Sequence, residues 1–164
     1  LFAGRIKNET SADVEQRMKA LVAQKGLTDQ VEFYNLLDDF LDLLAAVDVT
    51  VLPAESVYAK VDLPLTLLEA MARETPVIVA DAGPLPELLG VTAGAGGEQG
   101  RGGVTVPPQD APALAEALLS LIKEPGRLAA LGREAREMVE ERFSSKVMAR
   151  AHEELYRELL AYEG

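Results

Sequence analysis

The feature that most constrains the fold is an alternation of short β-branched runs with longer segments of helical period. Val49–Leu52, Val77–Val79 and Val104–Val106 are typical of strands, and each precedes a stretch whose apolar residues recur every three or four positions. Strands without a polar face are covered on both sides, as in parallel sheets. The expected class is therefore α/β, with a doubly wound parallel sheet and helices on both faces.

Capping residues mark where the helices should begin and end. Ser11 is expected to cap a helix that stops at Gly26, because a serine start and a glycine end are common signals. Pro64 is expected in the first turn of a later helix, where its missing N–H costs little. Asp110 is expected to cap the helix after Val104–Val106.

Charge and composition exclude several function classes. The net charge is −11, from 16 basic and 27 acidic residues, which disfavours binding to nucleic acid or to anionic lipid surfaces. Without cysteine, and with His152 as the only histidine, the chain has no disulfide, thiol nucleophile or Cys/His metal site. The lack of cysteine suits a reducing compartment, so we expect a cytoplasmic protein.

No membrane helix is expected, because no apolar run reaches the roughly 18 residues that one needs. A last helix should start at Ser144 or Ser145, and its apolar stripe from Val147 to Tyr162 is interpreted as a packing face. We interpret His152, beside two glutamates on that helix, as a surface residue.

The stretch from Val49 to Asp81 carries the candidate chemistry. A strand ends at Pro53, a loop follows, and Glu69 lies about one and a half turns into the next helix. Doubly wound sheets bind ligands at the carboxyl ends of their strands. The amides near Leu65 and Thr66 could hold a phosphate there, and the Glu69 carboxylate could accept hydrogen bonds from two ribose hydroxyls.

These residues resemble the donor-site signature of family 4 glycosyltransferases. The core of the resemblance is Asp62–Ala72 followed by Thr75–Ile78. The flanking segments also resemble the family, in the order Leu21–Leu27, Val31–Phe33, Leu43–Val49, Gly83–Leu88 and Gly102–Asp110. Each motif alone is weak, but their order and spacing are specific and cover nearly the whole chain.

The resemblance implies that residues 1–164 are the nucleotide-sugar-binding, Rossmann-like C-terminal half of a GT-B fold, truncated at its N-terminus. The active site would lie in a cleft against an N-terminal acceptor-binding domain of the same polypeptide. The enzyme would transfer a hexosyl group with retention from a UDP-, GDP- or ADP-linked donor, without a metal or another cofactor. This piece alone is expected to be inactive.

Two departures from the family pattern affect the site. The family's acidic pair is spaced E-x7-E, yet Val61 stands eight residues before Glu69. Asp62 or Glu55 could supply the missing acid toward the sugar, and Lys60 could offer a cation to the diphosphate. In addition, the family's phosphate-binding Arg and Lys would precede Leu1. The central first strand of the sheet would also be missing, which would leave a gap.

Structural interpretations stand beside these roles. Glu69 and Lys60 could be solvated side chains, and Asp62 could cap the helix at Pro64 while also contacting a sugar. Glu87 is interpreted as a structural residue of a short turn. The six glycines between residues 94 and 103 precede a strand and lack the phosphate-loop order, so a hairpin is favoured over a phosphate cradle.

Two other functions remain open. A non-catalytic GT-B-like binding or regulatory module would explain the absent first glutamate. Another sugar-nucleotide protein, such as a 2-epimerase or a starch or glycogen synthase, fits the Asp62–Glu69 run less well. The sequence leaves the donor base, the sugar and the acceptor undetermined.

Overall fold

The computed structural model describes residues 1–4, 6, 8–54, 63–92, 94 and 97–162. These residues belong to two compact units, Leu1–Phe40 and Leu41–Gly164. Apart from the antiparallel pair β5–β6, the paired strands of both units are parallel, and a helix lies between each strand and the next along the chain up to β5. The expected α/β class is confirmed.

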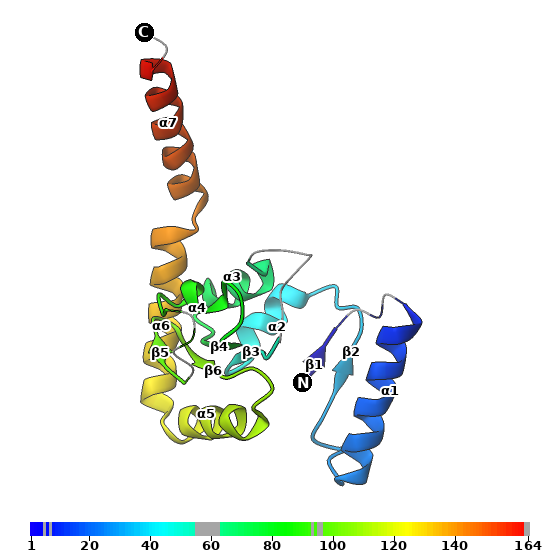
Figure 1. Ribbon diagram of the computed structural model, residues 1–164. Helices are drawn as coiled ribbons and strands as arrows, with labels where there is room; N and C mark the ends of the chain where they lie inside the picture. The colour runs from blue at the N-terminus through cyan, green and yellow to red at the C-terminus, as the bar shows by residue number, and fades with distance from the viewer. Residues whose placement is uncertain (5, 7, 55–62, 93, 95–96, 163–164) are drawn as a thin grey trace. The chain divides into compact units, whose positions relative to one another are not determined.

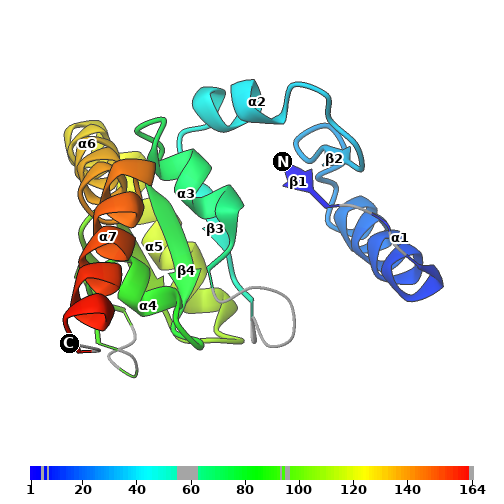
Figure 2. The same ribbon diagram turned by 90° about the horizontal axis from the view of Figure 1, so that it is seen from above.

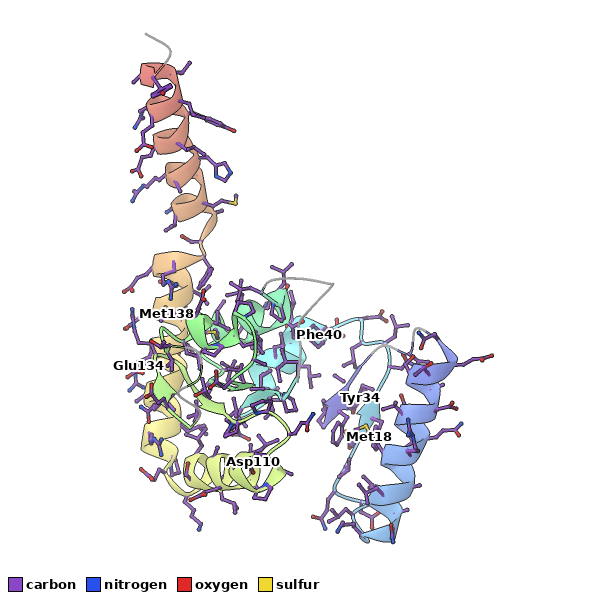
Figure 3. All side chains as sticks on the ribbon, viewed as in Figure 1. Met18, Tyr34, Phe40, Asp110, Glu134 and Met138 are labelled. Atoms are coloured by element: carbon purple, nitrogen blue, oxygen red, sulfur yellow. The ribbon has the colours of Figure 1, made fainter. Side chains whose placement is uncertain are left out.

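The first unit is a parallel strand pair with one long helix. Strand β1 (Phe2–Ala3) pairs with β2 (Phe33–Tyr34), and the rings of Phe2 and Phe33 stack with their centroids 5.1 Å apart. Helix α1 (Glu9–Gln24) connects the two strands, and its Met18 points toward them (Figure 3). No described side chain of α1 is fully buried, because two-residue strands offer little area to cover.

The start of α1 differs from the prediction. Asn8, rather than Ser11, is the N-cap: its Oδ1 accepts from the Ser11 amide at 2.9 Å, and the Ser11 hydroxyl accepts from the Asn8 amide at 3.0 Å. This reciprocal pair is a capping box, in which Ser11 is the third helical residue. Gly26 lies just after the helix with φ of +67°, which confirms the predicted stop.

The second unit contains a four-stranded sheet in the order β3-β4-β6-β5. Strands β3 (Thr50–Leu52), β4 (Val77–Ala80) and β6 (Gly103–Val106) are parallel, whereas β5 (Gln99–Gly100) is antiparallel to β6. All four side chains of β4 are at most 1% exposed. The uniform apolar character of this run is therefore explained by burial on both faces.

Helices cover both faces of this sheet. Figure 1 shows α3 (Leu65–Met71) and α4 (Leu85–Leu88) on one side of the strands and α5 (Ala111–Lys123) on the other. On the α5 side, Ile78 and Val106 form a core with Leu121 and Leu131. The remaining helices are α2 (Phe40–Ala46), α6 (Pro125–Arg142) and α7 (Ser145–Tyr162). Asp110 caps α5 as predicted, since its Oδ1 accepts from the Ala113 amide at 2.9 Å.

The glycine-rich segment forms the β5–β6 hairpin, as the sequence predicts. Its glycines allow close backbone packing: a Cβ on Gly103 would lie 2.2 Å from the carbonyl oxygen of Val77. A Cβ on Gly102, whose φ is +81°, would lie 2.4 Å from the Cα of Ala135 on α6. Side chains at these positions would therefore push β6 away from β4 and the hairpin away from α6.

Strand β3 lies at one edge of the four-stranded sheet. Its register pairs Thr50 with Val77 and Leu52 with Val79, and the Thr50 amide donates to Pro76. Since backbone groups alternate in direction along a strand, the N–H and C=O of Val51 point away from β4. Within the described residues, this edge has no neighbouring strand.

The end of α3 is a tight turn that leads into β4. The Thr75 amide donates to the Ala70 carbonyl at 3.1 Å, and the Glu74 amide donates to the Met71 carbonyl at 3.0 Å. These two hydrogen bonds form a Schellman motif at the end of the helix. Glu74 has a left-handed backbone with φ of 61°, at a position where glycine is usual. The buried Thr75 hydroxyl donates to the Leu44 carbonyl of α2 at 2.6 Å.

We predict that glycine is more stable than alanine at position 74. Both substitutions remove the exposed ion pair between Glu74 Oε1 and Arg136 Nη1, which are 3.4 Å apart. The difference in stability between the two variants therefore reports the cost of the left-handed backbone at this position. Glu74→Gly should exceed Glu74→Ala by about 1 kcal/mol in free energy of unfolding, measured in urea. Equal stabilities would contradict strain at this residue.

Candidate active site

Two parallel strands end at the same edge of the second unit. Strand β3 ends at Leu52 and is followed by Pro53, while β4 ends at Ala80 and is followed by Asp81. The carboxyl ends of parallel strands are where α/β sheets bind their ligands. Helix α3, which begins at Leu65, follows β3. Helix α4, which begins at Leu85, follows β4.

Helix α3 carries Glu69 on the rim of its buried face. Leu67, Ala70 and Met71 are at most 1% exposed, whereas Glu69 between them is only partly buried. The Glu69 carbonyl accepts from the Arg73 guanidinium at 3.2 Å. No described residue donates a hydrogen bond to the Glu69 carboxylate, so this group can accept bonds from a ligand.

The first turn of α3 is accessible to solvent. Leu65 is 67% exposed and Thr66 is also exposed, although Leu65 is a large apolar residue. Pro64 is the N-cap rather than a first-turn residue, and it makes no side-chain capping bond. The first amides of a helix have no acceptor inside it, so Leu65 and Thr66 can present N–H groups to an anion.

The other predicted site residues have different outcomes. Asp62, Glu55 and Lys60 lie outside the described residues, so their roles remain predictions. Glu87 is exposed on α4, where its carbonyl accepts from Arg142 at 3.1 Å, in keeping with a structural position. His152 is exposed on α7, as predicted.

Asp81 lies at this edge, at the end of the stretch singled out in the sequence, but the sequence analysis gave it no role. Its Oδ1 accepts from the Gly94 amide at 2.9 Å, and its own amide donates to the Val106 carbonyl of β6 at 2.8 Å. Asp81 therefore ties the segment after α4 to the carboxyl end of β4. An acid directly after a buried β-branched run is the signal that could have identified it.

The described part of the chain contains neither a metal-binding cluster nor a membrane-spanning helix. Within it, no group of three or more histidine or acidic residues is arranged to hold a metal ion. None of the helices among the described residues is long and apolar enough to cross a bilayer. All of the apolar residues of α7 are at least partly exposed to solvent.

Comparison with known families gives one match that covers most of the chain. The family model described as "Glycosyl transferases group 1" matches residues 1–138. A curated relative, the MMP alpha-(1->4)-mannosyltransferase of Mycolicibacterium hassiacum, is 34% identical over 143 residues, which are 86% of this chain and 32% of the relative.

Solved structures agree with the fold. The crystal structure of Anabaena Alr3699/HepE in complex with UDP has a TM-score of 0.78 at 22% identity, covering 94% of this chain and 40% of that one. The C-terminal domain of a group 1 glycosyl transferase (LpcC) from Francisella tularensis has a TM-score of 0.70 at 22% identity, covering 84% of this chain and 66% of that domain.

The chain spans only part of the curated relatives that it matches. It covers 14% of the exopolysaccharide phosphotransferase SCO2592 of Streptomyces coelicolor, which is 32% identical over 147 residues and 88% of this chain. It covers 42% of the mannosyltransferase LpcC of Rhizobium leguminosarum, at 31% identity over 98% of this chain.

We predict that Asp81→Ala exposes the Gly94 amide. A hydrogen bond to a charged acceptor contributes about 1.5–3 kcal/mol, so hydrogen exchange at Gly94 should accelerate at least about tenfold. NMR-detected exchange measures this rate, and Glu87→Ala, which removes an exposed acid, is the matched control. Unchanged exchange at Gly94 in Asp81→Ala would contradict the tether.

Proposed function

Because this chain belongs to the glycosyl transferases group 1 family, we propose that it binds the nucleotide-activated sugar donor of a glycosyltransferase. The observation that carries the proposal is the family match over residues 1–138. This range includes α3 and the strand ends at which ligands bind in α/β sheets.

The proposed reaction is transfer of a hexosyl group from the donor to an acceptor with retention at the anomeric carbon. Residues 1–164 would belong to the C-terminal donor-binding domain of a GT-B enzyme. An N-terminal domain of the same polypeptide would bind the acceptor, so this piece alone would be inactive. Mannosyltransferases among the relatives support a hexosyl donor.

Helix α3 would bind the donor through two kinds of group. The amides of Leu65 and Thr66 would donate to the diphosphate, and their first-turn position supports this role. The Glu69 carboxylate would accept hydrogen bonds from the ribose hydroxyls. Donors fixed in place before the reaction would stabilise the charge that develops on the leaving diphosphate without a metal ion.

The sugar itself would be held by an acid from the loop before α3. Asp62 is the first candidate because it lies close to Pro64 in sequence, and Glu55 is the second. Lys60 would add a positive charge toward the diphosphate. UDP is supported as the leaving group by the UDP complex of Alr3699/HepE, and GDP by a relative described as GDP-mannose-dependent. An ADP-linked donor is the third alternative.

A second candidate function is a non-catalytic GT-B-like module that binds or regulates. The observation in its favour is Val61, which stands where the family's first glutamate of E-x7-E is expected. Such a module could still bind nucleotide through α3. The lack of cysteine supports a cytoplasmic site of action for either function.

We predict that Glu69→Ala weakens donor binding and leaves the fold intact. Loss of hydrogen bonds to a charged acceptor should raise the dissociation constant about 10- to 150-fold, which corresponds to about 1.5–3 kcal/mol. Calorimetry of the longer protein with UDP, GDP and ADP measures this, with the exposed acid Glu87→Ala as the control. No binding of any of the three by the unsubstituted protein would refute the donor-site proposal.

We also predict that Asp62→Asn lowers kcat/KM at least about tenfold, or roughly 1.4 kcal/mol, with Glu55→Gln milder. Both amides keep the shape of the side chain and remove its charge. Steady-state kinetics of the longer protein with its sugar nucleotide distinguish the two acids. A larger loss with Glu55→Gln would transfer the role to Glu55, and two silent variants would remove both acids from the sugar site. Donor binding without measurable turnover by the unsubstituted longer protein would favour the non-catalytic module.

A further inference from the structure

We propose that the turn that ends α3, residues 72–75, is a positioning element for Glu69, held in place by Gly132 of α6 and Leu44 of α2. This inference rests on the proposed function, in which Glu69 binds the donor. In this proposal the turn itself does not contact the donor. It fixes the helix that carries the carboxylate, so residues on α2 and α6 would determine how well the donor binds.

The first contact is between α6 and the turn. A Cβ on Gly132 would lie 2.1 Å from the carbonyl oxygen of Glu74, which is well inside van der Waals contact. Helix α6 cannot easily retreat, because Leu131 and Ala135 beside Gly132 are 1% and 0% exposed. In addition, the β5–β6 hairpin packs on Ala135 through Gly102. A methyl group at position 132 must therefore displace the turn.

The second contact is between α2 and the turn. The Thr75 hydroxyl donates to the Leu44 carbonyl at 2.6 Å, and these residues are 2% and 5% exposed. A buried hydrogen bond of this kind is directional, and its loss leaves a buried carbonyl without that donor. The turn is thus fixed by a close approach from α6 and by a hydrogen bond to α2.

A displacement of the turn would reach Glu69 because little in between can deform. Ala70 and Met71, which directly follow Glu69, are both 0% exposed, and close-packed interiors transmit shifts rather than absorb them. Ala72 is three residues beyond Glu69, which is about 4.5 Å along a helix axis. The guanidinium of Arg73 is also bonded to the Glu69 carbonyl, at 3.2 Å.

The main test is Gly132→Ala in the longer protein. We expect the donor KM to rise between a few-fold and about 100-fold, because small misplacements of binding groups are costly, while the acceptor KM stays unchanged. Gly126→Ala is the matched control on the same helix, since a Cβ there meets nothing within 4 Å. Partial unfolding alone would reduce the amount of active enzyme without changing the donor KM.

A double-mutant cycle distinguishes positioning from a general effect on the fold. If Gly132 acts through Glu69, Gly132→Ala should add little to the donor KM of Glu69→Ala. The inference would be overturned if Gly132→Ala raised the donor KM by the same factor with and without Glu69→Ala, or if Gly132→Ala alone left the donor KM unchanged. Either result would leave the proposed function intact. A silent Glu69→Ala would instead refute the proposed site, and the positioning of Glu69 with it.

Thr75 gives a second test if Gly132→Ala does not fold. Thr75→Val keeps the volume of the side chain and removes the hydroxyl, whereas Thr75→Ser keeps the hydroxyl. We expect Thr75→Val to raise the donor KM when Glu69 is present but not when Glu69→Ala is also present. Thr75→Ser, which keeps the hydroxyl, should have the donor KM of the unsubstituted protein. A donor KM that is unchanged in Thr75→Val, or unrestored in Thr75→Ser, would count against the inference.

Discussion

Strand β4 is the constraint on which the second unit depends. Its four side chains are almost wholly inaccessible, so elements on both of its faces and both of its edges must fit against it. The candidate site is connected to this strand at both ends: α3 with Glu69 leads into it, and Asp81 follows it. A rigid central strand is what allows short helices and loops to hold polar groups at a defined edge.

Local rules predicted much of the fold. The β-branched run at Val77–Val79, the stop at Gly26 and the cap at Asp110 each follow from backbone and side-chain chemistry within a few residues. The cap of α1 was misassigned because Asn8 and Ser11 both satisfy the local preference. Only the reciprocal hydrogen bonds of the capping box show which of the two precedes the helix.

Tertiary contacts could not be predicted in the same way. Gly132 looks like an unfavourable helix residue in the sequence, and its purpose is visible only beside the Glu74 carbonyl. The tether from Asp81 to Gly94 spans thirteen positions with no repeating pattern to reveal it. For the site, the helix that follows Pro64 was predicted from the sequence, whereas the binding roles of its residues and of Asp62, Glu55 and Lys60 remain predictions.

Among the described residues, no strand pairs with the outer edge of β3, and this has a practical consequence for work with this segment. A strand that presents unpaired backbone groups can pair with another chain, and β-branched strands such as Thr50–Leu52 are well suited to it. The net charge of −11 opposes such association, because like-charged copies repel one another. Since added salt screens this repulsion, purification at low ionic strength should favour monodisperse material over strand-paired aggregates.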